Sequence, residues 1–171
     1  RRFRGRMKEL ILGLDTSNYR SSAALISLEG EVLLNERLLL PVAAGERGLR
    51  QNEAVFLQVR QMRHVLEKVR EAGQSGKIVA AACSIRPRDR EDSYMPVFQV
   101  GGTLAHGIAA AMDIPCYETS HQMGHLLAGA HGTSLASRER VLAVHLSGGI
   151  GNQIYNNTIF WDQRSEERRV G

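Results

Sequence analysis

The sequence predicts a mixed α/β fold in which an antiparallel meander of strands is followed by alternating helices and strands. Three apolar or alternating runs, separated by short polar turns, come first, and a long segment with apolar residues at helical spacing follows them. The 171 residues, 43% hydrophobic and 23% charged, are typical of a folded domain with a buried core.

The first three strands are predicted at residues 10–14, 22–28 and 32–39. The first is an apolar run that ends in the polar turn Asp15-Thr16-Ser17, and Glu29-Gly30-Glu31 supplies a tight turn between the second and third. Met7 looks like a natural start, so residues 1–6 are expected to be a non-native or disordered extension.

The first helix is predicted from Asn52 to about residue 72, with Gly73 as its stop signal. Its apolar residues at helical spacing are Val55, Val59, Met62, Val65, Leu66 and Val69. The later elements are a strand at 78–85, a helix at 103–112 after Gly101-Gly102, a strand at 114–117, a helix at 121–131 and a strand at 141–146. This order matches the ribonuclease-H-like lobe of the actin/Hsp70-like (ASKHA) nucleotide-binding fold, although the pattern alone leaves other mixed α/β folds open.

The charge and the cysteines indicate the cellular compartment of the protein but do not predict its function. The formal charge of +4 permits a nucleic-acid partner without predicting one, because the arginines crowd the two ends of the chain. Cys83 and Cys116 lie in apolar runs, which indicates buried thiols in a reduced, cytoplasmic protein. No apolar stretch approaches the roughly 20 residues of a membrane span, so no membrane partner is expected.

His121 and His125 are candidate metal ligands. They stand four residues apart on a predicted helix, so both imidazoles project from one face and can share one ion. With six histidines in the chain, such a pair can also arise by chance and serve as surface or core residues.

Two polar turns are candidate phosphate-binding sites. Ser147-Gly148-Gly149 ends an apolar strand and offers unhindered backbone amides with a hydroxyl, and Asp15-Thr16-Ser17 ends the first strand. Each has a plain alternative, a strand-ending turn for the former and a self-bonded Asx-type turn for the latter.

The order of these motifs resembles the tRNA N6-adenosine threonylcarbamoyltransferases, formerly described as glycoproteases or O-sialoglycoprotein endopeptidases, in a divergent bacterial branch. The segment Ile11-Leu12-Gly13-Leu14-Asp15-Thr16-Ser17 is similar to the opening strand and turn of that family. Residues 50–56 resemble the start of its first long helix, residues 115–128 its metal-binding helix, and residues 146–149 its phosphate loop.

The resemblance implies a transferase that delivers a threonylcarbamoyl group to the N6 amine of the adenosine next to the tRNA anticodon. It implies that His121 and His125 bind a divalent metal, iron or zinc, together with an aspartate of a second lobe. The nucleotide, ATP or threonylcarbamoyl-adenylate, would contact Ser147, Gly148 and Gly149, with Thr16 and Ser17 as further candidates and Asp15 as the catalytic candidate. The implied partners are tRNA and other threonylcarbamoyladenosine-synthesis proteins.

The resemblance covers residues 8–149 and breaks off after them. Residues 7–149 are therefore expected to be an amino-terminal lobe and residues 150–171 a truncated or artefactual tail, with the second lobe missing and the chain inactive alone. A non-catalytic scaffold or dimerisation partner of the tRNA-modification complex is the alternative. A metallopeptidase is disfavoured, because Gln122 stands where such enzymes carry a glutamate as general base.

Overall fold

The computed structural model describes residues 7–42, 49–138, 140–148 and 154–162. The chain divides into two compact units, Arg1–His121 and Gln122–Gly171. The extension at residues 1–6 lies outside the described residues. No described helix combines the length and the apolar character that a membrane crossing demands.

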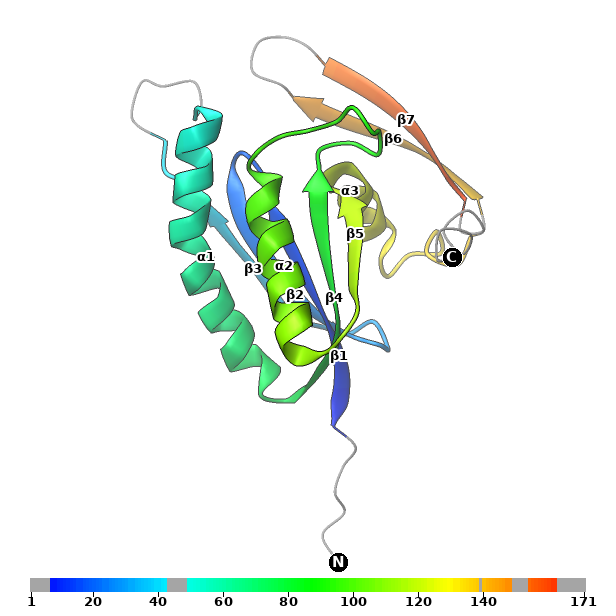
Figure 1. Cartoon of the computed structure of the whole chain (residues 1–171). Helices are drawn as coiled ribbons and strands as arrows, with labels where there is room; N and C mark the ends of the chain where they lie inside the picture. The colour runs from blue at the N-terminus through cyan, green and yellow to red at the C-terminus, as the bar shows by residue number, and fades with distance from the viewer. Residues whose placement is uncertain (1–6, 43–48, 139, 149–153, 163–171) are drawn as a thin grey trace, which may run out of the picture. The chain divides into compact units, whose positions relative to one another are not determined.

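The first unit is built on a five-stranded sheet with the strand order β3-β2-β1-β4-β5 (Figure 1). The strands are β1 (Lys8–Thr16), β2 (Arg20–Ser27), β3 (Val32–Leu39), β4 (Gly76–Arg86) and β5 (Cys116–Ser120). The first three form an antiparallel meander, whereas β4 runs parallel to β1 and β5 parallel to β4. This topology confirms the predicted fold class.

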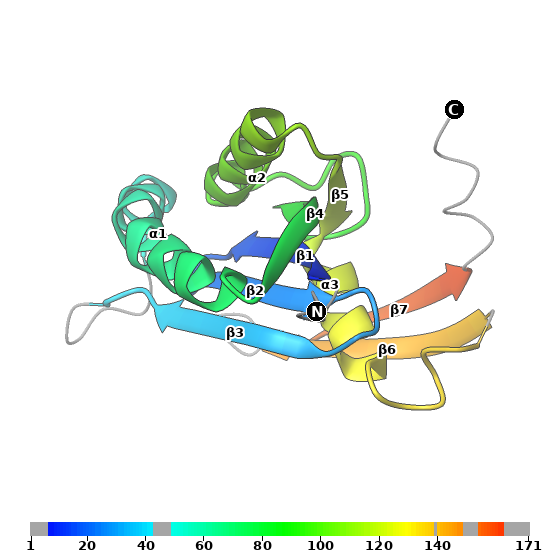
Figure 2. The same ribbon diagram turned by 90° about the horizontal axis from the view of Figure 1, so that it is seen from below.

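Two helices, α1 (Gln51–Gly73) and α2 (Phe98–Met112), cover the same face of this sheet (Figure 2). The core between helices and sheet is aliphatic, and each buried side chain of this kind contributes about 1.5–3 kcal/mol. Its buried members are Leu10, Leu12, Leu14, Ala23, Leu25, Met62, Val65, Val69, Cys83 and Ala105.

Helix α1 forms where the apolar spacing predicts it, and its buried stripe includes a polar residue. Val59 is 60% exposed, whereas Gln58 beside it is fully buried. The stripe that faces the sheet consists of Ala54, Gln58, Met62, Val65 and Val69. A polar side chain with buried hydrogen-bond partners therefore takes a place in the stripe, while the apolar Val59 faces outward.

Helix α2 begins at Phe98, five residues before the predicted start. Gly101 and Gly102 lie inside the helix rather than ahead of it. The Gly101 amide donates to Thr16 Oγ1 at 2.9 Å, and the Thr16 hydroxyl donates to the Val97 carbonyl at 2.8 Å. The two glycines therefore permit a close approach between α2 and the sheet, a requirement that local helix propensity does not reveal.

Gly101→Ala is expected to destabilise the protein although alanine favours helices. A Cβ at Gly101 would stand 2.8 Å from Thr16 Oγ1 and 3.3 Å from Thr16 Cγ2, so the helix must move away from β1. Overpacking of this kind costs about 1–3 kcal/mol, and we expect the lower half of that range. The measurement is the free energy of unfolding in urea.

The matched control is Gly107→Ala in the same helix. A Cβ there would meet nothing within 4 Å, so the substitution should stabilise the protein by about 0.5–1 kcal/mol through helix propensity alone. Equal shifts of the two variants in the same direction would contradict the close approach at Gly101.

Strand β5 lies two to three residues further along the chain than predicted. Asp113 ends α2 in the left-handed conformation, with φ of 52°, and its amide caps the helix on the carbonyls of Ala109 and Ala110. The chain then extends through Pro115, whose carbonyl accepts a hydrogen bond from the Ala81 amide at 2.9 Å. Pairing with β4 thus continues to Ser120, and α3 (His121–Ala130) begins at the next residue, as predicted.

The second unit contains a two-stranded antiparallel sheet of β6 (Arg140–Gly148) and β7 (Ile154–Asp162). Strand β6 was predicted to end at residue 146, but Ser147 and Gly148 continue it because they pair with Tyr155 and Ile154. Strand β7 falls within the segment expected to be a tail, and residues 163–171 lie outside the described part. The division into a lobe at 7–149 and a tail at 150–171 stays a prediction.

Candidate functional site

The carboxyl ends of three parallel strands bring together Asp15, Ser84 and His121. Asp15 is near the end of β1, Ser84 near the end of β4, and His121 directly follows β5. Carboxyl ends of parallel strands meet at one edge of a sheet, where α/β proteins commonly bind their ligands. The strand order β1-β4-β5 therefore positions these residues without any long loop.

Asp15 and His121 form a close hydrogen-bonded pair. His121 Nδ1 lies 2.9 Å from both carboxylate oxygens of Asp15, and the Ser84 hydroxyl donates to Asp15 Oδ1. The Phe98 ring packs against the imidazole at a centroid distance of 5.5 Å and a tilt of 52°. Both side chains of the pair are 29% exposed, so the pair is part-buried at the carboxyl edge of the sheet.

Thr16 and Ser17, the other candidates of this turn, both form hydrogen bonds within the protein, Thr16 to α2 and Ser17 to the turn itself. Thr16 is fully buried, and its hydroxyl both donates to Val97 and accepts from Gly101. Ser17 Oγ accepts from the amides of Tyr19 at 3.4 Å and Arg20 at 3.3 Å. The Ser17 contacts support the interpretation as a self-bonded turn, and nucleotide binding by the two residues stays a prediction.

The remaining candidates lie in the second unit. His125 follows His121 by one turn of α3, so by spacing both lie on one face of that helix. Ser147 and Gly148 are the last two residues of β6, and Gly149 lies outside the described residues. Their roles in metal and nucleotide binding stay predictions.

Two residues that hold the site in place were missed from the sequence. Ser84 is a polar residue near the end of the otherwise apolar strand β4. This break in the apolar pattern was the signal in the sequence that could have identified it. Gln58 is buried and polar within the apolar stripe of α1, and its amide nitrogen donates to the carbonyls of Ser17 and of Arg20. It also accepts from the Ser21 hydroxyl at 2.6 Å, so α1 fixes the turn that follows Asp15.

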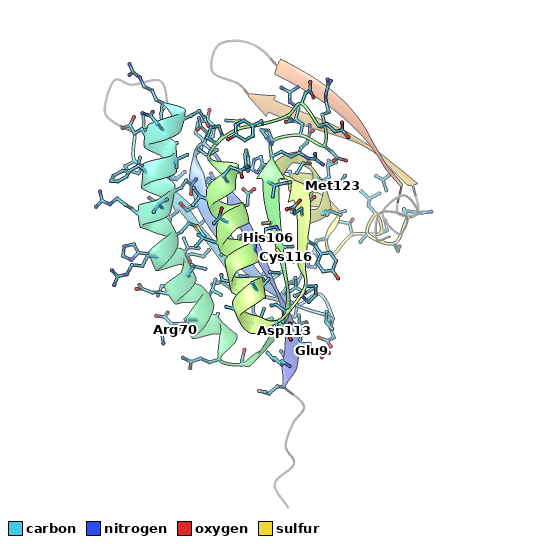
Figure 3. The ribbon with its side chains drawn as sticks, in the orientation of Figure 1. Glu9, Arg70, His106, Asp113, Cys116 and Met123 are labelled. Atoms are coloured by element: carbon cyan, nitrogen blue, oxygen red, sulfur yellow. The ribbon has the colours of Figure 1, made fainter. Side chains whose placement is uncertain are left out.

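The two cysteines are free and sit on neighbouring strands, Cys83 in β4 and Cys116 in β5. Figure 3 marks Cys116 beside His106 of α2. Burial, followed by the proximity of Cys116, raises the pKa of the Cys83 thiol to about 12. Burial also raises the pKa of the Cys116 thiol.

Cys83 is expected to resist alkylation in the folded, metal-free protein. Its thiol is 2% exposed and stays protonated well above neutral pH, whereas the thiolate is the form that reacts. Iodoacetamide should modify Cys116 at least about 10-fold faster than Cys83, and raising the pH to about 9 should accelerate Cys83 little. Peptide mass spectrometry measures both rates, and denatured protein, in which both sites should react alike, is the control.

A comparison with known proteins gives one curated sequence relative. It is the tRNA N6-adenosine threonylcarbamoyltransferase of Neorickettsia sennetsu, 29% identical over 119 residues that make up 70% of this chain and 34% of the relative. The chain thus spans about one third of the length of that relative. No protein-family model matches the sequence.

Solved structures with the same fold include YeaZ from Pseudomonas aeruginosa and the ROK hexokinase from Thermus thermophilus. YeaZ has a TM-score of 0.52 at 19% identity, over 91% of this chain and 62% of its own. The hexokinase has a TM-score of 0.53 at 19% identity, over 88% of this chain and 45% of its own. At these identities the structures establish the fold alone.

Sequence and structure thus confirm the two main predictions: the chain resembles the tRNA N6-adenosine threonylcarbamoyltransferases, and its first unit has the ribonuclease-H-like topology of an ASKHA lobe.

Proposed function

We propose that the protein acts in tRNA modification as a threonylcarbamoyltransferase, transferring the group from an adenylate to the N6 amine of an adenosine. The 29% identity to a protein of that name over 70% of the chain supports the reaction class. The single structural observation that carries the proposal is the contact of Asp15 with His121 at the carboxyl edge of the sheet.

The arrangement of the pair fits a divalent metal ion. Metal-binding histidines commonly donate one ring N–H to a carboxylate and use the other nitrogen as ligand, which fixes the orientation of the ring. An ionised Asp15 can only accept, so His121 would donate its Nδ1–H to it and use Nε2 as the ligand nitrogen. Imidazole nitrogens suit iron and zinc, the two metals that the resemblance implies.

Within this proposal each residue of the chain has a separate task. His121 and His125 hold the ion from one face of α3, and a bound ion would polarise the carbamoyl carbonyl and orient the donor. Asp15 is a positioning residue that sets the tautomer and direction of His121, and Ser84 fixes the Asp15 carboxylate in turn. Ser147, Gly148 and Gly149 would contact the adenylate phosphate.

The test is metal-dependent nucleotide binding by the full-length gene product. Calorimetric titration with ATP, in the presence and absence of zinc or iron, is compared between the parent and a His121→Ala/His125→Ala variant. The parent should bind ATP only with the metal, and the variant should lose this binding by about 100-fold or more, since both imidazole ligands are gone.

The matched control is His64→Ala/His131→Ala, which removes two exposed histidines outside the site. It should bind as the parent does. If the His121→Ala/His125→Ala variant binds metal and ATP like the parent, the histidines are structural and the transferase site is refuted. If the parent binds ATP only with the metal and the variant loses this binding, threonylcarbamoylation of tRNA by the same preparation is the decisive assay.

A second candidate, a non-catalytic dimerisation partner, is supported by an apolar groove between α1 and α2. The groove has a volume of about 500 Å³. It is lined by Val55, Val59, Met62, Arg63, Leu66, Pro96, Gln99, Val100, Thr103 and Leu104. Val59 in this lining is 60% exposed, and Phe56 on the same helix is 61% exposed. A second copy of the chain would bury this apolar surface by packing its own α1 there.

This candidate predicts a dimer that Val59→Asp disrupts. Sedimentation velocity should show the parent as a dimer and the variant as a monomer, whereas Lys68→Asp, a charge change on α1 outside the groove lining, should alter dimerisation less. A monomeric parent would refute dimerisation through this groove. A dimer that also binds ATP with metal would show that the two functions coexist.

A further inference from the structure

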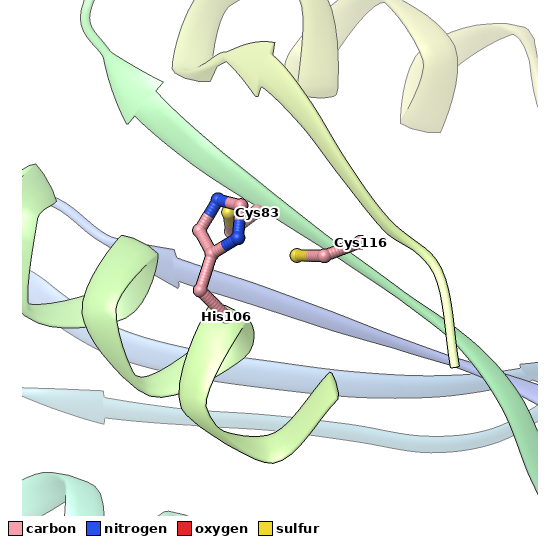
Figure 4. A group of neighbouring side chains, drawn as sticks. All are labelled: Cys83, His106 and Cys116. Carbon is pink, nitrogen blue, oxygen red and sulfur yellow. The ribbon is translucent and has the colours of Figure 1, made fainter. Parts of the chain in front are cut away.

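We propose that Cys83, His106 and Cys116 form a second metal site, for zinc, that is separate from the His121 site. One ligand atom of each residue lies within 4.8 Å of the corresponding atoms of the other two. The imidazole of His106 rises from α2 toward Cys83 of β4, and the sulfur of Cys116 on β5 points toward both (Figure 4). The inference stands independently of the proposed transferase activity.

The backbone explains why these three side chains converge. Strands β4 and β5 pair in parallel with Cys116 opposite Ala81, so Cys83 and Cys116 stand on adjacent strands two positions apart in register. Alternate residues of a strand point to opposite faces, and Cys83 joins the core beneath α2 while Ser84 reaches Asp15. The two candidate metal sites therefore use opposite faces of β4.

The geometry is close to that of a zinc site. Zinc–sulfur bonds of about 2.3 Å and zinc–nitrogen bonds of about 2.0 Å, at tetrahedral angles, separate the donor atoms by roughly 3.5–3.8 Å. Donor atoms within 4.8 Å need shifts of about 1 Å, which side-chain rotation supplies. Three protein ligands leave a fourth position for water, on the side where the His106 side chain is 51% exposed.

The ligand set and its neighbours select the kind of metal. Two sulfurs and one imidazole favour zinc among the common ions, whereas magnesium and calcium require oxygen ligands. His106 Nε2 lies 2.8 Å from Glu118 Oε1, the carboxylate–imidazole contact that orients metal-binding histidines. Glu118 stands opposite Cys83 in the strand register, so the same pair of strands supplies both sulfurs and the carboxylate.

Zinc binding displaces the protons of the two thiols and needs no other reactant. Each thiol releases its proton to solvent as its sulfur binds the ion, and the neutral imidazole donates a lone pair with no loss of a proton. No oxidant or reductant takes part. The reaction requires reduced thiols, and a disulfide between Cys83 and Cys116 would prevent it.

The test uses cobalt as a spectroscopic probe for zinc in the reduced, chelator-treated full chain. Cobalt bound by thiolates gives a sulfur-to-metal charge-transfer band and intense visible bands of tetrahedral coordination. The parent should show both, and stoichiometric zinc should abolish them by displacing the cobalt. Cys116→Ser and His106→Ala should each weaken zinc binding by about 100-fold or more, and Glu118→Gln by about 10-fold.

Two further variants make the result specific. His64→Ala removes an exposed histidine of α1 and should leave the charge-transfer band unchanged. His121→Ala/His125→Ala should also leave it unchanged, which separates this site from the proposed transferase site. Circular dichroism of Cys116→Ser, whose thiol is only part-buried, verifies that loss of binding is not loss of folding. The proposal is overturned if the parent gives no charge-transfer band, if Cys116→Ser retains it, or if the reduced thiols only form a disulfide.

Discussion

Gln58→Ala is expected to lower the free energy of unfolding by about 3 kcal/mol or more, the largest effect of a single substitution on stability. Gln58 is fully buried, yet it forms three hydrogen bonds, to the Ser21 hydroxyl and the carbonyls of Ser17 and Arg20. Alanine would remove all three bonds and leave a cavity; the Ser21 hydroxyl keeps Gln61 and the Arg20 carbonyl keeps the Ser17 amide, while the Ser17 carbonyl loses this buried donor. Each lost bond costs about 0.5–1.5 kcal/mol, and an unsatisfied buried group about 1–3 kcal/mol.

The matched control is Gln61→Ala, one turn later in the same helix. Gln61 is half-buried: it donates to the Leu39 carbonyl at 2.8 Å in an exposed bond that water can replace, and it accepts from the Ser21 hydroxyl at 3.0 Å in a part-buried one. Its loss should cost about 0.5–1.5 kcal/mol. Urea unfolding followed by circular dichroism measures both variants, and a Gln58→Ala effect as small as that of Gln61→Ala would show that the buried network contributes little.

The fold was predictable because its strands and helices carry strong local signals. The turn Glu29-Gly30-Glu31 separates two strands, and the third strand occupies residues 32–39 as predicted. Gly73 ends α1 where expected, and His121 begins α3. In these places local sequence preference and tertiary structure agree, so the pattern alone was sufficient.

The features that the sequence did not predict are those set by contacts between distant segments, such as the start of α2 and the burial of Gln58. Helix α2 includes Gly101 because Thr16, 85 positions away, holds its first turn and needs the space of a missing Cβ. Gln58 is buried because the turn after β1 supplies its partners. No window along the sequence contains both members of such a pair.

The candidate site was predictable only in part, because its residues also come from segments that are far apart in the sequence. His121 and Asp15 were chosen from separate motifs, and the structure places them in contact although they are 106 positions apart. The contribution of Ser84 and the convergence of Cys83, His106 and Cys116 depend on strand order, which the motifs did not include. The cysteines were interpreted only as buried thiols, since neither forms a metal-binding motif with its neighbours in sequence.

Asp15→Asn is expected to raise the metal concentration needed for half-maximal ATP binding by about 10–100-fold, equivalent to about 1.4–2.7 kcal/mol. The asparagine keeps the size of the side chain and an oxygen for the Ser84 hydroxyl. It removes the negative charge that fixes the Nδ1–H tautomer and the orientation of the His121 ring. Calorimetry with ATP at increasing zinc or iron concentrations measures the shift.

Glu118→Gln is the matched control, because Glu118 makes the equivalent contact with His106 at 2.8 Å on the other face of the sheet. It should leave metal-dependent ATP binding unchanged while weakening the thiolate–cobalt signal, and Asp15→Asn should do the reverse. Such a crossed pattern requires two independent sites, each with its own carboxylate–imidazole pair. If both substitutions affected both signals equally, one shared site or a general loss of structure would explain the data, and the assignment of separate sites would fail.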